Sequence, residues 1–213
     1  MVKNLFKMRT DYKGDHLKQN DLDKNPINQF NNWFIEAKKQ NILEPNAMIL
    51  STINKDNYPS SRTVLLKEVN KKGFIFFTNY NSNKGKEISH NSKVTLNFLW
   101  KKIEKQVIIQ GKAKKISDSI SANYFNSRPR KSQIAAWASN QSEKIENVKV
   151  LKDKFNKIEK EFEKIKNIPK PNHWGGYIVL PNKVEFWQGK KSRLHDRICY
   201  IFDKNWKKFR LSP

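Results

Sequence analysis

The chain has 213 residues, and its 43 Lys and Arg against 20 Asp and Glu give it a formal net charge of +23. Such an excess is typical of nucleic-acid-binding proteins, but here lysine is spread from Lys3 to Lys208 without an Arg-rich arm, a helix-turn-helix pairing or zinc-finger spacing. We therefore interpret the charge as a diffuse field that concentrates anionic, phosphorylated small molecules, and we expect no nucleic-acid partner.

The first predicted elements are one helix and a series of short strands. The helix spans 26–38, opens on Pro26 and carries a one-sided apolar stripe that ends at Ala37. Apolar or alternating runs separated by turn residues then predict strands at 47–53, 61–69, 74–78, 93–100 and 105–115. Because no long crossover helices separate these strands, they favour an antiparallel sheet or barrel over a doubly wound parallel sheet.

Helices and then further strands are predicted for the second half of the chain. Helices are expected at 117–126, 131–138 and 143–166, and strands at 176–180, 183–188, 193–202 and 206–210. The apolar stripe of the longest helix fits either a coiled-coil seam or a face packed on its own sheet, and its short length before Pro169 favours the sheet. The expected fold is mainly β with helices: an antiparallel barrel closed by C-terminal strands, with helices over its openings.

Several kinds of site and location are excluded by missing motifs. Neither a dinucleotide-binding nor a P-loop glycine pattern occurs, and the four histidines lack metal-ligand spacing, so we expect no nicotinamide, ATP or metal site. No signal peptide and no run of about 20 apolar residues is present. Cys199 is the single cysteine and lies among apolar residues, which predicts a packed, inert thiol and a reducing, cytoplasmic location.

The arginines are the strongest candidates for a binding site. Seven of the 43 basic residues are Arg, and five of them fall in three short segments that also contain His, Gln, Ser, Trp and Tyr: Arg62, Arg128, Arg130, Arg193 and Arg197. A planar guanidinium holds a phosphate or another bidentate partner in a fixed geometry, which a lysine does poorly. Ordinary surface ion pairs are the alternative explanation for each arginine.

The first two segments suggest phosphate contacts. Arg62 and Lys67 are five residues apart, so on one strand they would project to opposite faces and serve two different anions. Tyr124, Arg128 and Ser132 recur every four residues, which would gather them on one helix face around a phosphate. Pro129 disfavours helix at Arg128, so the three residues would alternatively lie across a turn between two helices.

The third segment, 185–197, places cationic groups at period two. On a strand, Arg193, His195 and Arg197 would all face the same side. Three such groups beside a core are costly unless an anionic ligand satisfies them.

These segments resemble the pyridoxamine 5′-phosphate oxidase family, and the likeness runs from about Arg9 to the C-terminal RLSP. The matching stretches occur in the family's order: RTVLLK at 62–67, FFTN at 76–79, SNK at 82–84, KQV at 105–107, YFNSRPRKSQIAAWASNQS at 124–142, PNHWGGY at 171–177 and EFWQGKKSRLHDR at 185–197.

The resemblance implies a split β-barrel FMN-binding fold and a homodimer with FMN at the subunit interface. It implies a mobile N-terminal segment, 1–25, and a single domain, 26–213. The positions implied to bind the cofactor are Arg62, Thr63, Val64, Leu65, Lys67, Phe77, Thr78, Asn83, Lys84, Gln106, Gln141, Ser142, Trp187 and Arg197. Those implied to bind the substrate are Arg9, Tyr12, Lys67, Tyr124, Arg128, Ser132, Arg193 and His195, and Arg193 and His195 are the implied catalytic pair.

The implied reaction is hydride transfer from C4′ of pyridoxamine or pyridoxine 5′-phosphate to the flavin. Reoxidation by O2 gives hydrogen peroxide, and the product is pyridoxal 5′-phosphate, with ammonia released from the amine. The resemblance leaves open whether His195 orients the pyridine ring or takes a proton. A flavin-binding protein without oxidase activity is the alternative function.

Four positions depart from the family pattern. Asn83 stands where Arg is common beside the flavin phosphate, Lys105 where Arg precedes Gln106, Phe77 where Tyr is common, and Thr10 where a second Arg follows Arg9. Asn83 is expected to weaken FMN binding most, because it removes a full charge from a phosphate contact.

Overall fold

The computed structural model describes residues 5–213, which divide into two compact units. The first unit comprises the described residues up to Leu50, Thr95–Gly111 and Pro181–Pro213, and the second comprises Ser51–Val94 and Lys112–Leu180. No helix in residues 5–213 is long and apolar enough to cross a membrane.

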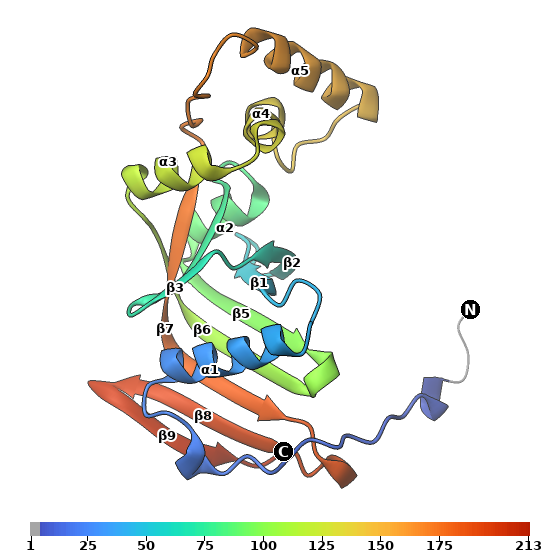
Figure 1. Cartoon of the computed structure of the whole chain (residues 1–213), viewed down its shortest axis with the longest axis vertical. Helices are drawn as coiled ribbons and strands as arrows, with labels where there is room; N and C mark the ends of the chain where they lie inside the picture. The colour runs from blue at the N-terminus through green and yellow to red at the C-terminus, as the bar shows by residue number, and fades with distance from the viewer. Residues whose placement is uncertain (1–4) are drawn as a thin grey trace. The chain divides into compact units, whose positions relative to one another are not determined.

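Nine strands form one sheet (Figure 1). They are β1 (Ala47–Ile53), β2 (Pro59–Leu65), β3 (Glu68–Asn70), β4 (Gly73–Asn79), β5 (Lys93–Trp100), β6 (Lys105–Lys115), β7 (Trp174–Gln188), β8 (Asp196–Asp203) and β9 (Asn205–Leu211). The order is β2-β1-β5-β6-β7-β4-β3, and β8 pairs with β7 and with β9. The pairs β3–β4, β4–β7, β7–β8 and β8–β9 are antiparallel, as the strand pattern predicts.

Helix α1 (Pro26–Lys39) forms where it is predicted and closes the core of the first unit. The Asn25 side chain accepts a hydrogen bond from the Ile27 amide, which caps the first turn. The Phe30 ring meets Phe98 edge-on at 4.9 Å, and Trp33 meets Phe186 at 5.1 Å. The apolar stripe of this helix is therefore a packing face.

Cys199 lies in the same core, on β8. It is fully buried, and burial raises the pKa of its thiol. The prediction of a packed cysteine is confirmed, and its inertness stays a prediction.

Strand β7 is continuous, although the sequence predicts two separate strands there. Residues Trp174–Val179 pair with β4, and residues Lys183–Gln188 pair with β8. Pro181 lies between these two paired stretches, where its missing N–H removes no bond from either ladder. The proline therefore does not end the strand.

In the second unit, the predicted strand 61–69 is broken and an unpredicted helix follows β4. Strand β2 ends at Leu65, and the Lys67 amide donates to the Ile75 carbonyl at 2.9 Å just before β3. Helix α2 (Asn83–His90) begins after Ser82, whose hydroxyl accepts from the Gly85 amide.

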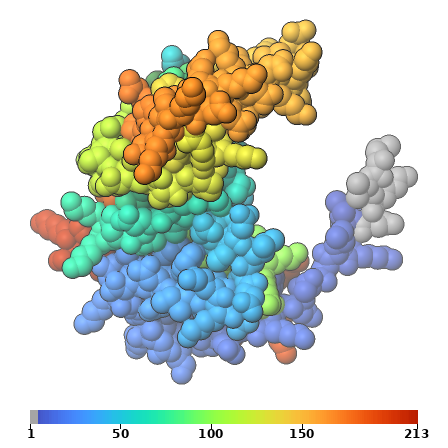
Figure 2. Space-filling view, turned by 45° about the horizontal axis from the view of Figure 1, so that its top comes forward, coloured from blue at the N-terminus to red at the C-terminus, as the bar shows by residue number. Residues whose placement is uncertain are grey.

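Three further helices belong to the second unit: α3 (Asp118–Ser127), α4 (Arg130–Ala138) and α5 (Val148–Glu161). Helix α5 is shorter than predicted and packs against α4, not on a sheet, so that prediction is wrong (Figure 2). Its Phe155 and Ile158 contact a cluster that includes Ile134 of α4, and no α5 residue is fully buried. An amphipathic stripe shows that a helix has a packing face but does not identify its partner.

Candidate functional site

A cavity of about 750 Å³ in the second unit collects most of the predicted phosphate ligands. Its volume suits a small-molecule ligand. The predicted site residues that line it are Arg62, Thr63, Val64, Leu65, Lys67, Phe77, Thr78, Lys84, Tyr124, Arg128, Ser132 and Gln141. Arg62 and Lys67 line this one cavity, so the prediction that they project to opposite faces is wrong, while their service of two different anions stays a prediction. The break in the strand before Lys67 removes the alternation on which it depended.

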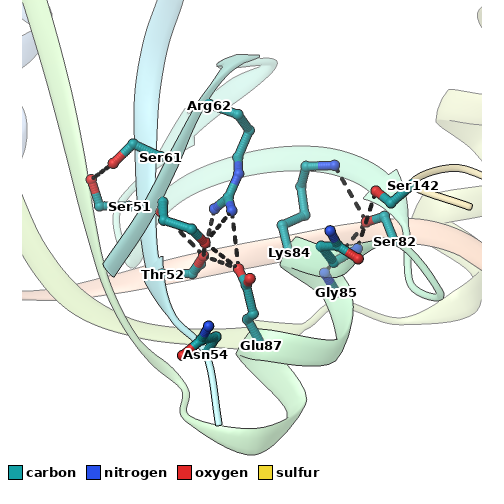
Figure 3. A network of polar contacts seen from close by, with 12 residues as sticks. Ser51, Thr52, Asn54, Ser61, Arg62, Ser82, Lys84, Gly85, Glu87 and Ser142 are labelled. Atoms are coloured by element: carbon teal, nitrogen blue, oxygen red, sulfur yellow. Dashed lines mark hydrogen bonds and ion pairs between the residues drawn. The ribbon is translucent and has the colours of Figure 1, made fainter. Parts of the chain in front are cut away.

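Arg62 lies at one part of this cavity within a dense polar network (Figure 3). Its Nη2 donates to Ser60 Oγ at 2.6 Å and to Glu87 Oε2 at 3.0 Å, and its Nη1 donates to Thr52. Burial alone would raise the Glu87 pKa, but hydrogen bonds from Thr52 and Ser60 and the charge of Arg62 outweigh burial and lower it. Glu87 is therefore ionised near neutral pH.

Lys84 brings a second cation to the cavity. It is 8% exposed, and its ammonium donates to Ser82 Oγ and to Gln141 Oε1, each at 3.3 Å. The Thr78 hydroxyl donates to the same Gln141 oxygen at 3.5 Å. Burial lowers the pKa of Lys84, and the charge of Arg62 lowers it further. Arg62, Lys84 and the Thr78 hydroxyl all line the cavity. Two cations and a hydroxyl form a donor set suited to a phosphate.

Aromatic rings form another wall of the cavity. Phe77 stacks on Tyr124 at 4.0 Å and on Trp174 at 5.4 Å. The Arg128 guanidinium lies 4.8 Å over the Trp174 ring. The rings thus give the cavity a flat apolar surface with a cation at its edge.

Arg128 has an unsatisfied hydrogen-bond donor. Its Nη1 is buried, and within residues 5–213 it has no hydrogen-bond partner. Burial lowers the pKa of this guanidinium. Leaving a charged donor unsatisfied is unfavourable, so this position calls for an anionic acceptor.

Tyr124, Arg128 and Ser132 lie across a turn, which decides between the two predicted arrangements. Helix α3 ends at Ser127, α4 begins at Arg130, and Arg128 has an extended conformation. The side-chain Nε2 of Gln133 donates to the Phe125, Asn126 and Arg128 carbonyls and fixes the turn. All three predicted ligands still line the same cavity.

The remaining predicted residues lie in the first unit, except for Asn83 and Ser142. Three of them form an aromatic group: the Tyr12 ring meets Trp187 at 5.5 Å and His195 at 5.3 Å, and Trp187 meets His195 at 4.8 Å. Tyr12 belongs to the N-terminal segment, whose Leu17 amide donates to Asp196 at 2.8 Å. The N-terminal segment, which is predicted to close over the substrate, therefore contacts His195 through Tyr12.

His195 is held in one tautomer. The Lys190 amide donates to its Nδ1 at 3.0 Å, so the neutral imidazole carries its proton on Nε2. Burial lowers the His195 pKa, and the nearby charge of Arg193 lowers it further. The neutral ring thus presents an N–H donor.

Arg193, His195 and Arg197 do not share a strand face, so that prediction is wrong. Ser192 and Arg193 have positive φ angles of 55° and 61° and form a short 3-10 turn, and β8 begins only at Asp196. Consecutive left-handed backbone at residues other than glycine is rare and is found where function constrains the chain. Arg193 is exposed on this turn.

Of the other predicted ligands in the first unit, two are hydrogen-bonded to side chains of the protein and one is exposed. Arg197 donates from Nε to Glu185 at 2.7 Å, and the side-chain Nε2 of Gln106 donates to Asn97 Oδ1 at 3.0 Å. Arg9 is exposed.

Asn83 and Ser142 lie beside the cavity of the second unit. The Asn83 amide donates to Ser142 Oγ at 3.2 Å, and the Asn83 side chain is exposed and does not line the cavity.

Sequence reasoning assigned no role to Trp174, Glu87, Thr52 or Ser60. Trp174 lies within the quoted PNHWGGY stretch, but a strand tryptophan is ordinarily a core residue. Glu87 is the single acid in the stretch SNKGKEISH, and this isolated acid among lysines is the signal that could have identified it.

The chain is similar to known proteins along nearly its whole length. Residues 34–162 match the model of pyridoxamine 5′-phosphate oxidase, and residues 174–213 match that of the pyridoxine 5′-phosphate oxidase C-terminal dimerisation region. The chain is 52% identical to pyridoxine/pyridoxamine 5′-phosphate oxidase 2 of Hydrogenovibrio crunogenus and 48% identical to the oxidase of Leptospira biflexa, with both chains of each pair covered completely.

Solved structures show the same fold. PhzG from Burkholderia lata, in complex with tetrahydrophenazine-1-carboxylic acid, superimposes with a TM-score of 0.88 at 27% identity and covers 94% of this chain and 99% of its own. A pyridoxamine 5′-phosphate oxidase-related, FMN-binding protein from Nostoc punctiforme gives 0.69 at 12% identity and covers 86% and 97%. The fold is thus the split β-barrel predicted from the sequence, and the chain belongs to the pyridoxamine 5′-phosphate oxidase family.

Proposed function

We propose that this protein oxidises pyridoxamine 5′-phosphate and pyridoxine 5′-phosphate to pyridoxal 5′-phosphate, with FMN as cofactor and O2 as oxidant. It would act in the cytoplasm as a homodimer with FMN at the subunit interface, and residues 174–213 match a dimerisation region. The curated relatives carry the names of this activity. The observation that carries the proposal is the Nη1 of Arg128, which is buried, has no hydrogen-bond partner among residues 5–213 and lies in a cavity with other phosphate donors.

The donors around Arg62 and Lys84 fit the phosphate of FMN. Two cations and the Thr78 hydroxyl match the charge and the acceptor oxygens of a phosphate monoester. We assign Thr63, Val64, Leu65, Phe77, Gln141 and Ser142 to the flavin beside them, and Asn83 to a weak contact at the phosphate. Gln106, Trp187 and Arg197 are assigned to the remainder of the flavin. When bound, FMN supplies a hydride acceptor that O2 reoxidises with release of hydrogen peroxide.

A second set of donors fits the phosphate of the substrate. Lys67, Tyr124, Arg128 and Ser132 line the same cavity, and the Arg128 guanidinium is oriented by the Trp174 ring. Binding a phosphate here would satisfy the buried Arg128 donor, so it gives more stabilisation than a contact at an exposed arginine.

Arg193 and His195 are assigned to the substrate's pyridine ring. The neutral His195 offers its Nε2–H as a hydrogen-bond donor, because Nδ1 accepts from the Lys190 amide. We therefore assign His195 to orienting the ring and not to removing a proton at Nε2. Arg193 would press on the ring with its planar guanidinium, and Tyr12 and Arg9 would close over it.

Product formation tests the proposal. Incubation of the FMN-loaded protein with pyridoxamine 5′-phosphate in air should yield pyridoxal 5′-phosphate, hydrogen peroxide and ammonia in equal amounts, and pyridoxine 5′-phosphate should yield the same products without ammonia. Protein that binds FMN and forms none of these products would instead be the flavin-binding protein considered above.

A further inference from the structure

Glu87 lies beside the arginine assigned to the cofactor phosphate, and its side chain is turned towards that arginine (Figure 3). The carboxylate is 12% exposed and the Arg62 side chain is 21% exposed, so both are largely removed from solvent. Glu87 is the single acidic residue of α2. A carboxylate at an anion-binding site is unexpected, because it repels the phosphate.

A single oxygen of Glu87, on α2, accepts hydrogen bonds from residues of β1 and β2. Its Oε2 accepts from Arg62 Nη2 at 3.0 Å, from Ser60 Oγ at 2.8 Å and from the Thr52 hydroxyl. Arg62 donates in turn to Thr52 and, at 2.6 Å, to Ser60. The four residues come from β1, β2 and α2. The bonds of Arg62 and Glu87 are charge-assisted, and together they form one network of hydrogen bonds that strengthen each other. The guanidinium is thereby held in one orientation.

Glu87 also allows two cations to share the cavity. Burial lowers the pKa of Lys84 most, the positive charge of Arg62 lowers it further, and the negative charge of Glu87 raises it. Without the carboxylate, Arg62 and Lys84 would repel each other across a partly desolvated site. The carboxylate thus offsets part of the repulsion between Arg62 and Lys84 before a ligand arrives.

We propose that Glu87 is a positioning residue for the cofactor phosphate, which it serves by fixing the Arg62 guanidinium in advance of binding. A long side chain that is already ordered loses little conformational entropy when the ligand binds. The Glu87 charge is compensated by Arg62 at 3.0 Å, so its repulsion of the phosphate is the smaller effect. This inference rests on the proposed function, in which FMN is the ligand.

The test compares FMN with riboflavin, which has the same ring and ribityl chain but no phosphate. Flavin-free protein is titrated with each ligand, and quenching of the flavin fluorescence gives the dissociation constants. Glu87→Ala should weaken FMN binding about tenfold, since immobilising one long side chain contributes about that factor. Its riboflavin affinity should be unchanged. Glu87→Gln should stay within about threefold of the parent, because one amide oxygen can accept the bonds that Oε2 now accepts.

Lys86→Ala provides the matched control. Lys86 is an exposed neighbour on the same helix, so its removal tests for a general effect on α2. It should leave both affinities unchanged. Ser60→Ala provides a second variant on β2 that removes one contact of Glu87 and one of Arg62. It should weaken FMN binding about threefold without affecting riboflavin, whether or not Glu87→Ala folds.

Three results would overturn the inference. They are an unchanged or tighter FMN affinity in Glu87→Ala, an equal loss for FMN and riboflavin, and, where Glu87→Ala does not fold, an unchanged FMN affinity in Ser60→Ala. A parent protein that binds FMN no better than riboflavin would contradict the assigned phosphate site itself. That result is distinguishable from a failure of the Glu87 inference, because it is obtained with the unsubstituted protein.

Discussion

The guanidinium of Arg128 lies 4.8 Å over the ring of Trp174, and its Nη1 is buried without a hydrogen-bond partner in the described part of the chain. Arg128→Ala should therefore weaken binding of pyridoxamine 5′-phosphate roughly ten- to hundredfold, because a charge-assisted hydrogen bond contributes about 1.5–3 kcal/mol. Lys67→Ala should have an effect of the same kind but smaller, because Lys67 is exposed.

Unphosphorylated pyridoxine provides the control for the substrate phosphate pocket. Its binding should change little in either variant, because it makes none of the phosphate contacts. Dissociation constants for both ligands, measured with FMN-loaded protein, check this. Parallel losses for the two ligands would show that the substrate phosphate lies elsewhere.

A second prediction concerns Arg193, which ends a turn of positive φ before β8. Arg193→Lys should slow anaerobic flavin reduction by at least about tenfold and leave the FMN content of the protein unchanged, because an ammonium cannot reproduce a planar guanidinium against a ring. Rapid-mixing absorbance measurements give the rate. An equal rate in variant and parent would remove Arg193 from the catalytic pair.

His195 gives a pH-dependent prediction. Burial and the charge of Arg193 lower its pKa, so the ring is neutral at pH 7 and gains a proton only as the pH falls through that lowered value. Protonation places a hydrogen on Nδ1 and breaks the bond from the Lys190 amide. The rate of flavin reduction should fall on this acidic side.

The matched variant for this pH profile is His195→Asn. Its flavin should be reduced more slowly than in the parent, and the part of the decrease in rate at acidic pH that arises from the imidazole should be absent. The substrate phosphate also titrates, with a pKa near about 6, and its contribution remains in the variant. Identical pH profiles in both proteins would show that the decline has another origin.

FMN binding should depend on pH through Lys84. Burial and the charge of Arg62 lower its pKa, so the ammonium loses its proton at a lower pH than an exposed lysine. FMN affinity should therefore decrease as the pH rises through that value, because the phosphate binds the protonated form. Lys84→Arg should retain its affinity over the same range, since an arginine stays charged. Equal decreases in both proteins would exclude Lys84 as the group responsible.

Asn83→Arg should tighten FMN binding about tenfold, since a charge-assisted contact contributes about 1.5–3 kcal/mol and the site is partly exposed to solvent. The Asn83 amide begins α2 next to Lys84, and its exposed side chain leaves room for a longer residue. Excess FMN should then produce a larger thermal shift in the variant than in the parent, and salt should reduce the difference. An unchanged dissociation constant would show that position 83 points away from the phosphate.

Much of the fold follows from local sequence patterns. The alternating or apolar runs at 47–53, 93–100 and 105–115 form strands with the predicted bounds, and α1 forms where Pro26 and its apolar stripe place it. Helix α2 was missed because SNKGKEISH has few apolar residues to show a period.

The candidate site was less predictable because it depends on backbone geometry and on contacts distant in the sequence. The period-two reading of Arg193, His195 and Arg197 failed since Ser192 and Arg193 adopt a left-handed backbone that side-chain types do not signal. The Arg62–Glu87 pair joins residues 25 positions apart on different elements, and no spacing rule predicts it. The assignment of flavin and substrate ligands came from the family resemblance, and it remains a prediction.

Anaerobic reduction of the bound flavin tests the central claim most directly. Protein saturated with FMN is mixed with pyridoxamine 5′-phosphate in the absence of O2, and the flavin absorbance is followed. The proposed function predicts that the yellow colour is lost, that it returns when O2 is admitted, and that one pyridoxal 5′-phosphate forms for each flavin reduced. A flavin that stays oxidised in the presence of bound substrate would contradict the oxidase activity and leave a flavin-binding protein.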